Sequence, residues 1–466
     1  MQTFVALVKG ITFSLVVLAG QVAVAETVGS KTAEPESVAA SDLLALYQQA
    51  QSRDPRVLIA ESAARRAGYQ NREALGQLLP QVSADVRLTR THYTNTRQET
   101  YYNGERYSVS ISQVLFDASV WQSYQRSRSL REQYQAKSLS DIQGVAADLA
   151  QRYFDVLAAQ DSLTLIQAEK RVVVRSLERI KSLLARQLAS LPEKLEVEAR
   201  LDRLVSDEIE AENRIRVARE ALSEVVGRAV YERLERLTET PDISGFELRD
   251  YAYWREQALT GSPLIQARAA AVEAKRREKK GELGNHLPKV TLQLSSQRSN
   301  IGYENSLSGE TESNVASLNV QIPIFSGGST QARVNAAYES LVIARQELEQ
   351  TKRGVLREIK TAYLNTESSL ARMRASERAL QSAIKAREAA EKSFSYGMNN
   401  VVDVLDRTRE QYSAHRDLLE ARYSFFLSYV VLKRWTGDLQ ESDLAQINEL
   451  LVINEPQYTA VGVTGQ

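Results

Sequence analysis

The chain contains no cysteine among its 466 residues. It therefore has no disulfide bond and no cysteine to which a lipid anchor could be attached. Its 59 basic and 59 acidic residues give a formal net charge of zero. A nucleic-acid-binding protein instead needs a basic surface that neutralises phosphates. These absences exclude a lipoprotein and argue against nucleic acid as a partner.

Histidine is almost as scarce. His92, His286 and His415 are the only three, and they lie far apart in the sequence. No metal-ligand spacing, nucleophile triad or phosphate-binding loop accompanies them, and Gly327-Gly328 suits a strand-to-helix turn. We therefore expect no enzyme activity, no cofactor and no metal site.

Long apolar runs are also lacking, apart from one near the amino terminus. Residues 11–19 are predominantly apolar and follow Lys9. A membrane anchor is the alternative interpretation, but a spanning helix needs about 20 apolar residues. Ala23 and Ala25 supply the small residues of a signal-peptidase site, so we predict a signal peptide at 1–25 and an extension at 26–41.

The rest of the chain repeats itself. Six landmarks recur at an offset that drifts only from 208 to 210. They are Pro55 and Pro263, Pro80 and Pro288, Phe116 and Phe325, Gly144 and Gly354, Tyr153 and Tyr363, and Gly227 and Gly437. We assign a first structural repeat to 42–240, a second to 241–451, and a flexible tail to 452–466.

Each repeat has the same predicted order of elements. A helix (42–78 and 263–284) stops at Leu-Pro, because proline does not continue a helix. A β-hairpin follows at about 81–116 and 289–325, with polar loops at 95–106 and 302–313. A long helix pair then covers 118–226 and 330–436. Its first helices, 118–190 and 330–396, would each be on the order of 100 Å long.

Both long helices carry an apolar residue every three or four positions, which is typical of a coiled-coil seam. The seam residues are Leu177, Ile180, Leu184, Leu188 and Leu191 in the first repeat, and Leu370, Met373, Leu380 and Ile384 in the second. Segments 228–260 and 437–451 are expected to link or close the repeats.

The hairpin segments alternate apolar and polar residues, as in Val82-Ser83-Ala84-Asp85. This pattern also fits ordinary half-buried strands. In a membrane, however, four strands cannot close a barrel, because the smallest outer-membrane barrels need 8. Three chains would supply 12. Phe116 and Phe325, at equivalent strand ends, would then suit an aromatic girdle in contact with outer-membrane lipid.

Several motifs resemble the TolC family of outer-membrane efflux proteins. They are Leu79-Pro80-Gln81-Val82, Val114-Leu115-Phe116-Asp117, residues 322–328 and residues 396–406, and the resemblance spans about 42–451. It implies a mainly α-helical homotrimer with a 12-strand β-barrel in the outer membrane of a Gram-negative bacterium and a helical tunnel in the periplasm. A periplasmic adaptor and an inner-membrane pump of ABC or resistance-nodulation-division type would be its partners.

The resemblance also implies a constriction at the periplasmic tip, ringed by carboxylates that match Asp403 and Asp406. These residues are spaced i, i+3 and share one helical face. The alternative is that they are ordinary acidic residues at a helix amino terminus. Six carboxylates in a trimer would favour cations.

Family members often lock the closed tip through a tyrosine and an arginine of this segment, bonded to the neighbouring coil, and Gly397 belongs to the same tip neighbourhood. The matching positions hold Phe394 and Asn399. Glu196 matches the acidic partner if Ser190 is aligned with Gly397. We therefore expect a weaker or differently built closed state.

The predicted function is an outer-membrane channel-tunnel of a tripartite efflux or type I secretion system. A periplasmic coiled-coil adaptor or scaffold is the alternative, but the duplicated amphipathic hairpins argue against it. The sequence leaves the cargo, drug or protein, and the identity of the pump open.

Overall fold

The computed structural model describes residues 41–96, 98–300 and 309–452. The predicted signal peptide and nearly all of the predicted extension and tail lie outside these ranges. Among the described residues, no helix is both long enough and apolar enough to cross a membrane. The predicted mainly helical fold with four long strands is confirmed.

Each half of the chain opens with two helices separated by a single residue. These are α2 (Leu43–Arg53) and α3 (Pro55–Gly76) in the first half, and α6 (Tyr251–Gly261) and α7 (Pro263–Gly284) in the second. The prediction of one unbroken helix over 42–78 was therefore wrong. Asp54 and Ser262 each precede a proline and leave the helical conformation, with ψ of 121° and 117°, because proline disfavours the helical conformation of its predecessor.

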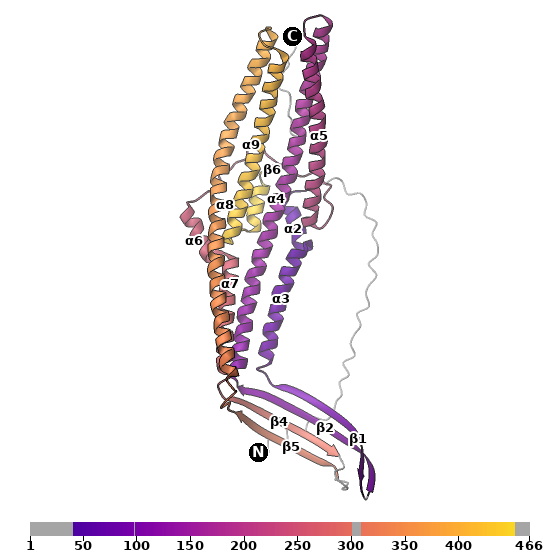
Figure 1. Cartoon of the computed structure of the whole chain (residues 1–466), viewed down its shortest axis with the longest axis vertical. Helices are drawn as coiled ribbons and strands as arrows, with labels where there is room; N and C mark the ends of the chain where they lie inside the picture. Colours follow the sequence, from indigo (N-terminus) through magenta and orange to yellow (C-terminus); the bar gives the residue numbers. More distant parts are fainter. Residues whose placement is uncertain (1–40, 97, 301–308, 453–466) are drawn as a thin grey trace. The chain divides into compact units, whose positions relative to one another are not determined.

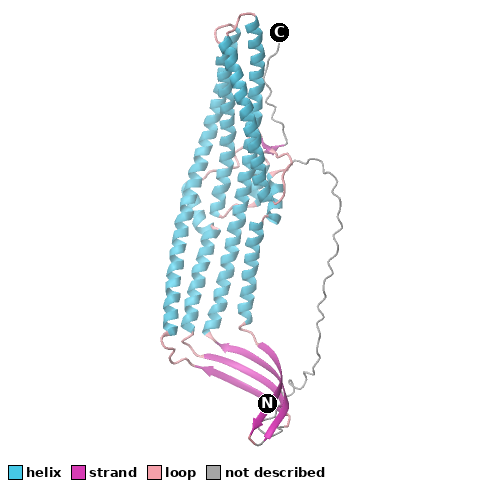
Figure 2. Ribbon diagram, turned by 45° about the vertical axis from the view of Figure 1, so that its right-hand side comes forward, coloured by secondary structure: helices cyan, strands magenta, loops and turns pink. Residues whose placement is uncertain are grey.

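The four long strands form one antiparallel sheet in the order β1-β2-β4-β5. The strands are β1 (Gln81–Asn95), β2 (Gln98–Phe116), β4 (Lys289–Asn300) and β5 (Thr311–Gln321). They reach further into the predicted loops 95–106 and 302–313 than the sequence indicated, because polar residues there still pair. Strands β1 and β5 are the two edges of this sheet (Figures 1 and 2).

The two faces of the sheet differ in chemistry. One face carries large apolar side chains that are 44–69% exposed: Val82, Val86, Leu88, Val109, Leu318 and Val320. The other carries hydroxyls, amides and a few charges, and Ser83 and Ser110 hydrogen-bond across it at 2.7 Å. Cross-strand partners share a face, so the alternation continues across the four strands. The exceptions include Val315, which lies opposite Ser295 on the polar face, and Glu105, which lies opposite Leu88 on the apolar face. The apolar face lacks a covering layer within the described part of the chain.

Two helix pairs continue from the sheet. Helix α4 (Ala118–Ala185, 68 residues) turns into α5 (Leu191–Val226), and α8 (Ser329–Ser395, 67 residues) turns into α9 (Val401–Thr436). Helix α4 packs on α5, and α8 packs on α9, while α7 and α9 also contact α4. Leu177 and Ile180 of the predicted seam are buried, but Leu188 and Leu191 are 71% and 55% exposed. The seam therefore ends before the turn.

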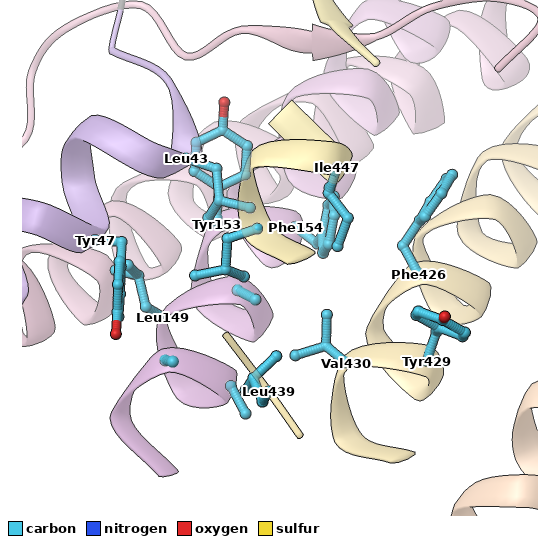
Figure 3. Packing of buried hydrophobic residues seen from close by; sticks show 14 of the residues in the cluster. Leu43, Tyr47, Leu149, Tyr153, Phe154, Phe426, Tyr429, Val430, Leu439 and Ile447 are labelled. Carbon is cyan, nitrogen blue, oxygen red and sulfur yellow. The ribbon is translucent and has the colours of Figure 1, made fainter. Parts of the chain in front are cut away.

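An aromatic-rich core joins the two halves (Figure 3). Phe154 of α4 stacks against Tyr423 and Phe426 of α9, with ring centroids 5.5 and 6.4 Å apart. The segments predicted only as linkers contribute Phe246, Leu439 and Ile447. They form α10 (Glu441–Asn448) and the short pair β3 (Arg236–Leu237) with β6 (Leu451–Val452).

Candidate functional site at the helix tips

The two helix turns are built alike. Ser190 caps α5 and forms a capping box with Glu193, and Asn400 caps α9 and forms a capping box with Asp403. Each cap satisfies backbone N–H groups that the first helical turn leaves without partners. Ser190 and Asn400 are thus equivalent, at the same offset of 210 as Gly227 and Gly437.

This equivalence corrects the alignment of Ser190 with Gly397. With the caps matched, Glu193 corresponds to Asp403 and Glu196 corresponds to Asp406. Glu196 is therefore the first-half counterpart of a candidate ring residue rather than the counterpart of a lock partner. The sequence could have shown this correspondence, because the landmark pairs from Gly144 and Gly354 to Gly227 and Gly437 share the constant offset of 210.

Asp403 has a local role in its own helix. Its Oδ2 accepts from the Asn400 N–H at 3.3 Å, and its own N–H donates to Asn400 Oδ1 at 2.9 Å. The interpretation of Asp403 as a helix amino-terminal carboxylate therefore holds within the single chain. The side chain remains exposed, so this role does not remove it from the face that Asp406 shares.

Asp406 makes a contact between the two helix pairs. Arg200 of α5 donates from Nη1 to Asp406 Oδ1 at 2.9 Å and from Nη2 to the Leu405 carbonyl oxygen at 2.7 Å. The same Nη2 lies 3.5 Å from Glu169 Oε1 of α4. Burial raises the pKa of the Glu169 carboxyl, and the charge of Arg200 opposes that shift. Arg200 therefore bridges α4, α5 and α9.

Phe394 makes the second contact between the pairs. The Arg179 guanidinium of α4 lies 4.4 Å from the centroid of the Phe394 ring, which is within the range of a cation–π interaction. Phe394 also packs against an apolar cluster that joins α4, α5 and α9 and includes Val197 and Leu405. Arginine and phenylalanine thus meet near the position where the sequence lacks the usual tyrosine and arginine.

The remaining predicted tip residues lie in the turn itself. Gly397 has a φ of 74°, a left-handed conformation that glycine adopts without strain. Asn399 is exposed beside it. The structure thus places Gly397 and Asn399 in the turn, and Glu196 away from them on α5.

The candidate ring residues line the same hollow. Asp403 and Asp406 border a space of about 370 Å³ with Arg407, Arg409 and Glu410. A larger hollow of about 500 Å³ between α4, α5 and α9 includes Glu196, Arg200 and Asp406. Among the residues that the structure describes, no group of three or more His, Asp or Glu side chains could hold a metal ion.

Sequence reasoning missed one buried charge cluster further along α4. Asp161 is 4% exposed, accepts a hydrogen bond from the Tyr423 hydroxyl of α9, and lies 3.5 Å from Arg236 of β3. Burial raises the pKa of Asp161, and the charge of Arg236 opposes the shift. The three residues are far apart in the sequence, so no local pattern marks them.

Phe116 and Phe325, the two aromatic residues predicted to lie at the membrane boundary, occupy different positions relative to their strands. Phe116 ends β2 after a bulge, pairs with Val290 and shares its apolar face. Phe325 lies beyond the end of β5 at Gln321 and is 87% exposed. The prediction that both end strands at equivalent places was therefore wrong for Phe325, because Pro323 lacks the N–H that a strand pairing needs.

Comparison with known proteins identifies a family and relatives that this chain resembles in sequence. The family model described as outer membrane efflux protein matches residues 46–228 and 254–438. The outer membrane protein TolC of Vibrio cholerae serotype O1 is 30% identical over 418 residues, covering 88% of this chain and 94% of that protein. The alkaline protease secretion protein AprF of Pseudomonas aeruginosa is 27% identical over 432 residues, covering 90% and 89%.

Solved structures agree on the fold. The outer membrane protein VceC of Vibrio cholerae superposes with a TM-score of 0.73 at 17% identity, covering 85% of this chain and 97% of that one. The outer-membrane channel OprN superposes with a TM-score of 0.72 at 18% identity, covering 85% and 90%. The duplicated helices, the open sheet and the family match together show that this chain belongs to the outer membrane efflux protein family, the TolC-like channels.

Proposed function

We propose that three copies of this chain close a barrel in the outer membrane and continue it as a helical tunnel. As a TolC-like protein, the chain is an outer-membrane channel-tunnel for efflux or secretion. The observation that carries the trimer proposal is the sheet, which has two open edges and one exposed apolar face. Open edges are not tolerated in lipid, so β1 and β5 must pair with other copies.

The polar face of the sheet would line the inside of the barrel, so the barrel must be wide enough to enclose water. This width decides how many copies are needed. Two copies would give eight strands, whose interior is just wide enough to be filled by side chains. Three copies give 12 strands and leave room for a watery duct lined by residues such as Asp85, Arg87 and Gln293. Phe116 would then contact lipid at the boundary nearest the helices, and the exposed Phe325 would lie close to the same boundary.

The relatives support the proposed partners. The names of AprF and of the proteases secretion protein PrtF of Dickeya chrysanthemi refer to protein secretion. In the proposed assembly the helix tips meet a periplasmic adaptor and an inner-membrane pump of ABC or resistance-nodulation-division type. The pump decides whether drugs or proteins pass through the duct.

The proposed constriction is an acidic ring of Asp403 and Asp406 from three copies. Their shared exposed face supports this proposal, and Glu193 and Glu196 offer an equivalent acidic pair on α5. A ring of this kind should attract multivalent cations. Arg200 would reduce the negative charge of this ring, because its guanidinium group forms an ion pair with Asp406 in each copy.

The ring is tested by block of single channels with a trivalent cation. Asp403→Asn together with Asp406→Asn should abolish the block, and asparagine is preferred to alanine because Asp403 is part of a capping box. Glu420→Gln, about four turns further along α9 and outside the hollow that Asp403 and Asp406 border, is the matched control and should retain block. Undiminished block in the double variant would refute the ring.

The trimer is tested on protein purified from outer membranes. Native mass spectrometry should give three copies, and the same sample should form stable conducting channels in planar bilayers. A monomer without channel activity would contradict the proposal and favour the alternative of a periplasmic adaptor or scaffold.

A further inference from the structure

Two arginines lie directly opposite each other on the polar face of the sheet. Arg87 of β1 is the cross-strand partner of Arg106 of β2. Directly opposed residues have Cβ atoms about 4.5–5.5 Å apart, and like charges in such pairs destabilise the sheet. The pairing therefore works against strand association unless something else binds both side chains.

Carboxylates do not neutralise this pair in the described part of the sheet. The ion pairs found on these strands join His92 to Glu99, Lys289 to Asp117, and Arg298 to Glu310. None of them involves Arg87 or Arg106. The Nε atom of Arg106 is shielded from solvent and has no hydrogen-bond acceptor.

One acid shares the polar face with the arginines. Asp85 lies two positions before Arg87 and opposite Ser108, and it forms no ion pair with either arginine in the described strands. Asp85, Arg87 and Arg106 together leave an excess of one positive charge per chain on this part of the face. The excess is concentrated where the two guanidinium groups lie.

The row that contains the arginines crosses the whole sheet at one level. Arg106 pairs with Ser299 of β4, and Ser299 pairs with Thr311 of β5. The Thr311 hydroxyl donates to the Ser299 carbonyl oxygen at 3.1 Å. This row therefore offers two guanidinium groups and two hydroxyls, and it contains no carboxylate.

We propose that Arg87 and Arg106 form an oxyanion-binding belt inside the outer-membrane barrel. This inference rests on the proposed function, because three copies are needed to bring six guanidinium groups around one lumen. Guanidinium groups bind oxyanions such as phosphate through paired hydrogen bonds, and rings of arginine select anions in pores. A bound oxyanion would also relieve the repulsion between the paired arginines.

The belt takes its ligand from the aqueous lumen. In the proposed barrel, lipid contacts the opposite side of the sheet, where the exposed apolar residues Val82, Val86 and Leu88 lie. A solute leaving the cell would thus pass the acidic face at the helix tips first and the basic belt afterwards. The two regions have opposite charge preferences and act in series.

The test uses the assembled wild-type protein and the double variant Arg87→Gln with Arg106→Gln in planar bilayers. Inorganic phosphate is the probe, added at constant ionic strength. Wild-type current should fall as phosphate binds, and the double variant should need about tenfold more phosphate or more, as expected from the loss of a charge-assisted hydrogen bond. In a potassium chloride gradient, the reversal potential of the double variant should shift towards the potassium equilibrium potential.

Arg90→Gln is the matched control, because Arg90 lies on the same strand but on the apolar-face side. It should leave phosphate sensitivity and reversal potential unchanged. If the double variant conducts with wild-type phosphate sensitivity and reversal potential, the belt is overturned while the channel stands. If wild-type protein forms no channels at all, the proposed function itself fails.

A second readout covers the case in which the double variant does not assemble. Phosphate should raise the thermal unfolding temperature of the detergent-solubilised wild-type trimer, and Arg87→Gln alone should weaken that increase. Equal stabilisation of wild type and Arg87→Gln by phosphate would overturn the belt without any need for conductance.

Discussion

Arg200 is the residue whose replacement tests the tip contacts most sharply. Arg200→Met keeps much of the aliphatic stem and removes the guanidinium group that reaches Asp406, the Leu405 carbonyl and Glu169. Loss of the ion pair with Asp406 costs at most about 1 kcal/mol, because the Asp406 side chain is 60% exposed and solvent screens the pair.

The larger cost comes from the buried partners. The Glu169 side chain is 11% exposed, and a buried group that loses its partner costs about 1–3 kcal/mol. Together with the Leu405 carbonyl, we expect a loss of about 2–4 kcal/mol in the local stability of the tip. Amide hydrogen exchange at the start of α9 should then accelerate between about 30-fold and about 1,000-fold.

The pH dependence of this loss has a defined sign. The folded-state pKa of Glu169 is already raised by burial, and it should rise further without Arg200. Protonation of Glu169 then removes the penalty, so the effect of Arg200→Met should be largest at neutral pH and shrink as the pH falls. Glu169→Gln in the Arg200→Met background should likewise restore most of the protection.

Asp406→Asn is the control, and it should accelerate exchange by less than about tenfold, because only the screened ion pair is lost. The reasoning is refuted if Arg200→Met changes exchange by less than about threefold. It is also refuted if Asp406→Asn matches the full effect of Arg200→Met, since the buried partners would then contribute nothing.

Three further predictions concern other parts of the chain. Asp161 has a raised folded-state pKa, so its stabilising contribution grows as the pH falls from neutral; Asp161→Asn should flatten the thermal stability profile between pH 7 and 5, measured by circular dichroism. Gly437→Ala should lower the unfolding temperature by several degrees, because a Cβ would lie 2.5 Å from a carbonyl oxygen at a φ of 82°, whereas Gly354→Ala, with open space around it, should not. Leu88→Arg should destabilise the membrane-inserted trimer by about 2–4 kcal/mol in folding titrations, and Thr89→Arg on the polar face should have a much smaller effect.

The periodic parts of the fold could be predicted from the sequence. The period of two along the hairpins and the long proline-free runs gave the four strands and the long helices, and α7 lies at the predicted residues 263–284. The break at Asp54 could also have been read, because the proline that follows it restricts its conformation. The short elements α6, α10 and β3–β6 could not, because they are too short to show a period.

The contacts at the tip depended on the fold rather than on local pattern. Arg200 and Asp406 are 206 positions apart, and only the packing of α5 beside α9 brings them together. Phe394 was assigned by resemblance, and the structure shows that it receives Arg179 from the other helix pair. The correspondence of Glu196 with Asp406 became clear only once the two helix caps were located.

The most direct test of the channel account is a cysteine-labelling scan along β1 in reconstituted trimers. The native chain has no cysteine, so each introduced thiol is the only one present in each copy. Ser83→Cys, Asp85→Cys and Arg87→Cys should react with a small membrane-impermeant maleimide through the lumen, while Val82→Cys, Val86→Cys and Leu88→Cys should be protected by lipid. Equal labelling at the two sets of positions would contradict a membrane barrel with a shared polar lumen.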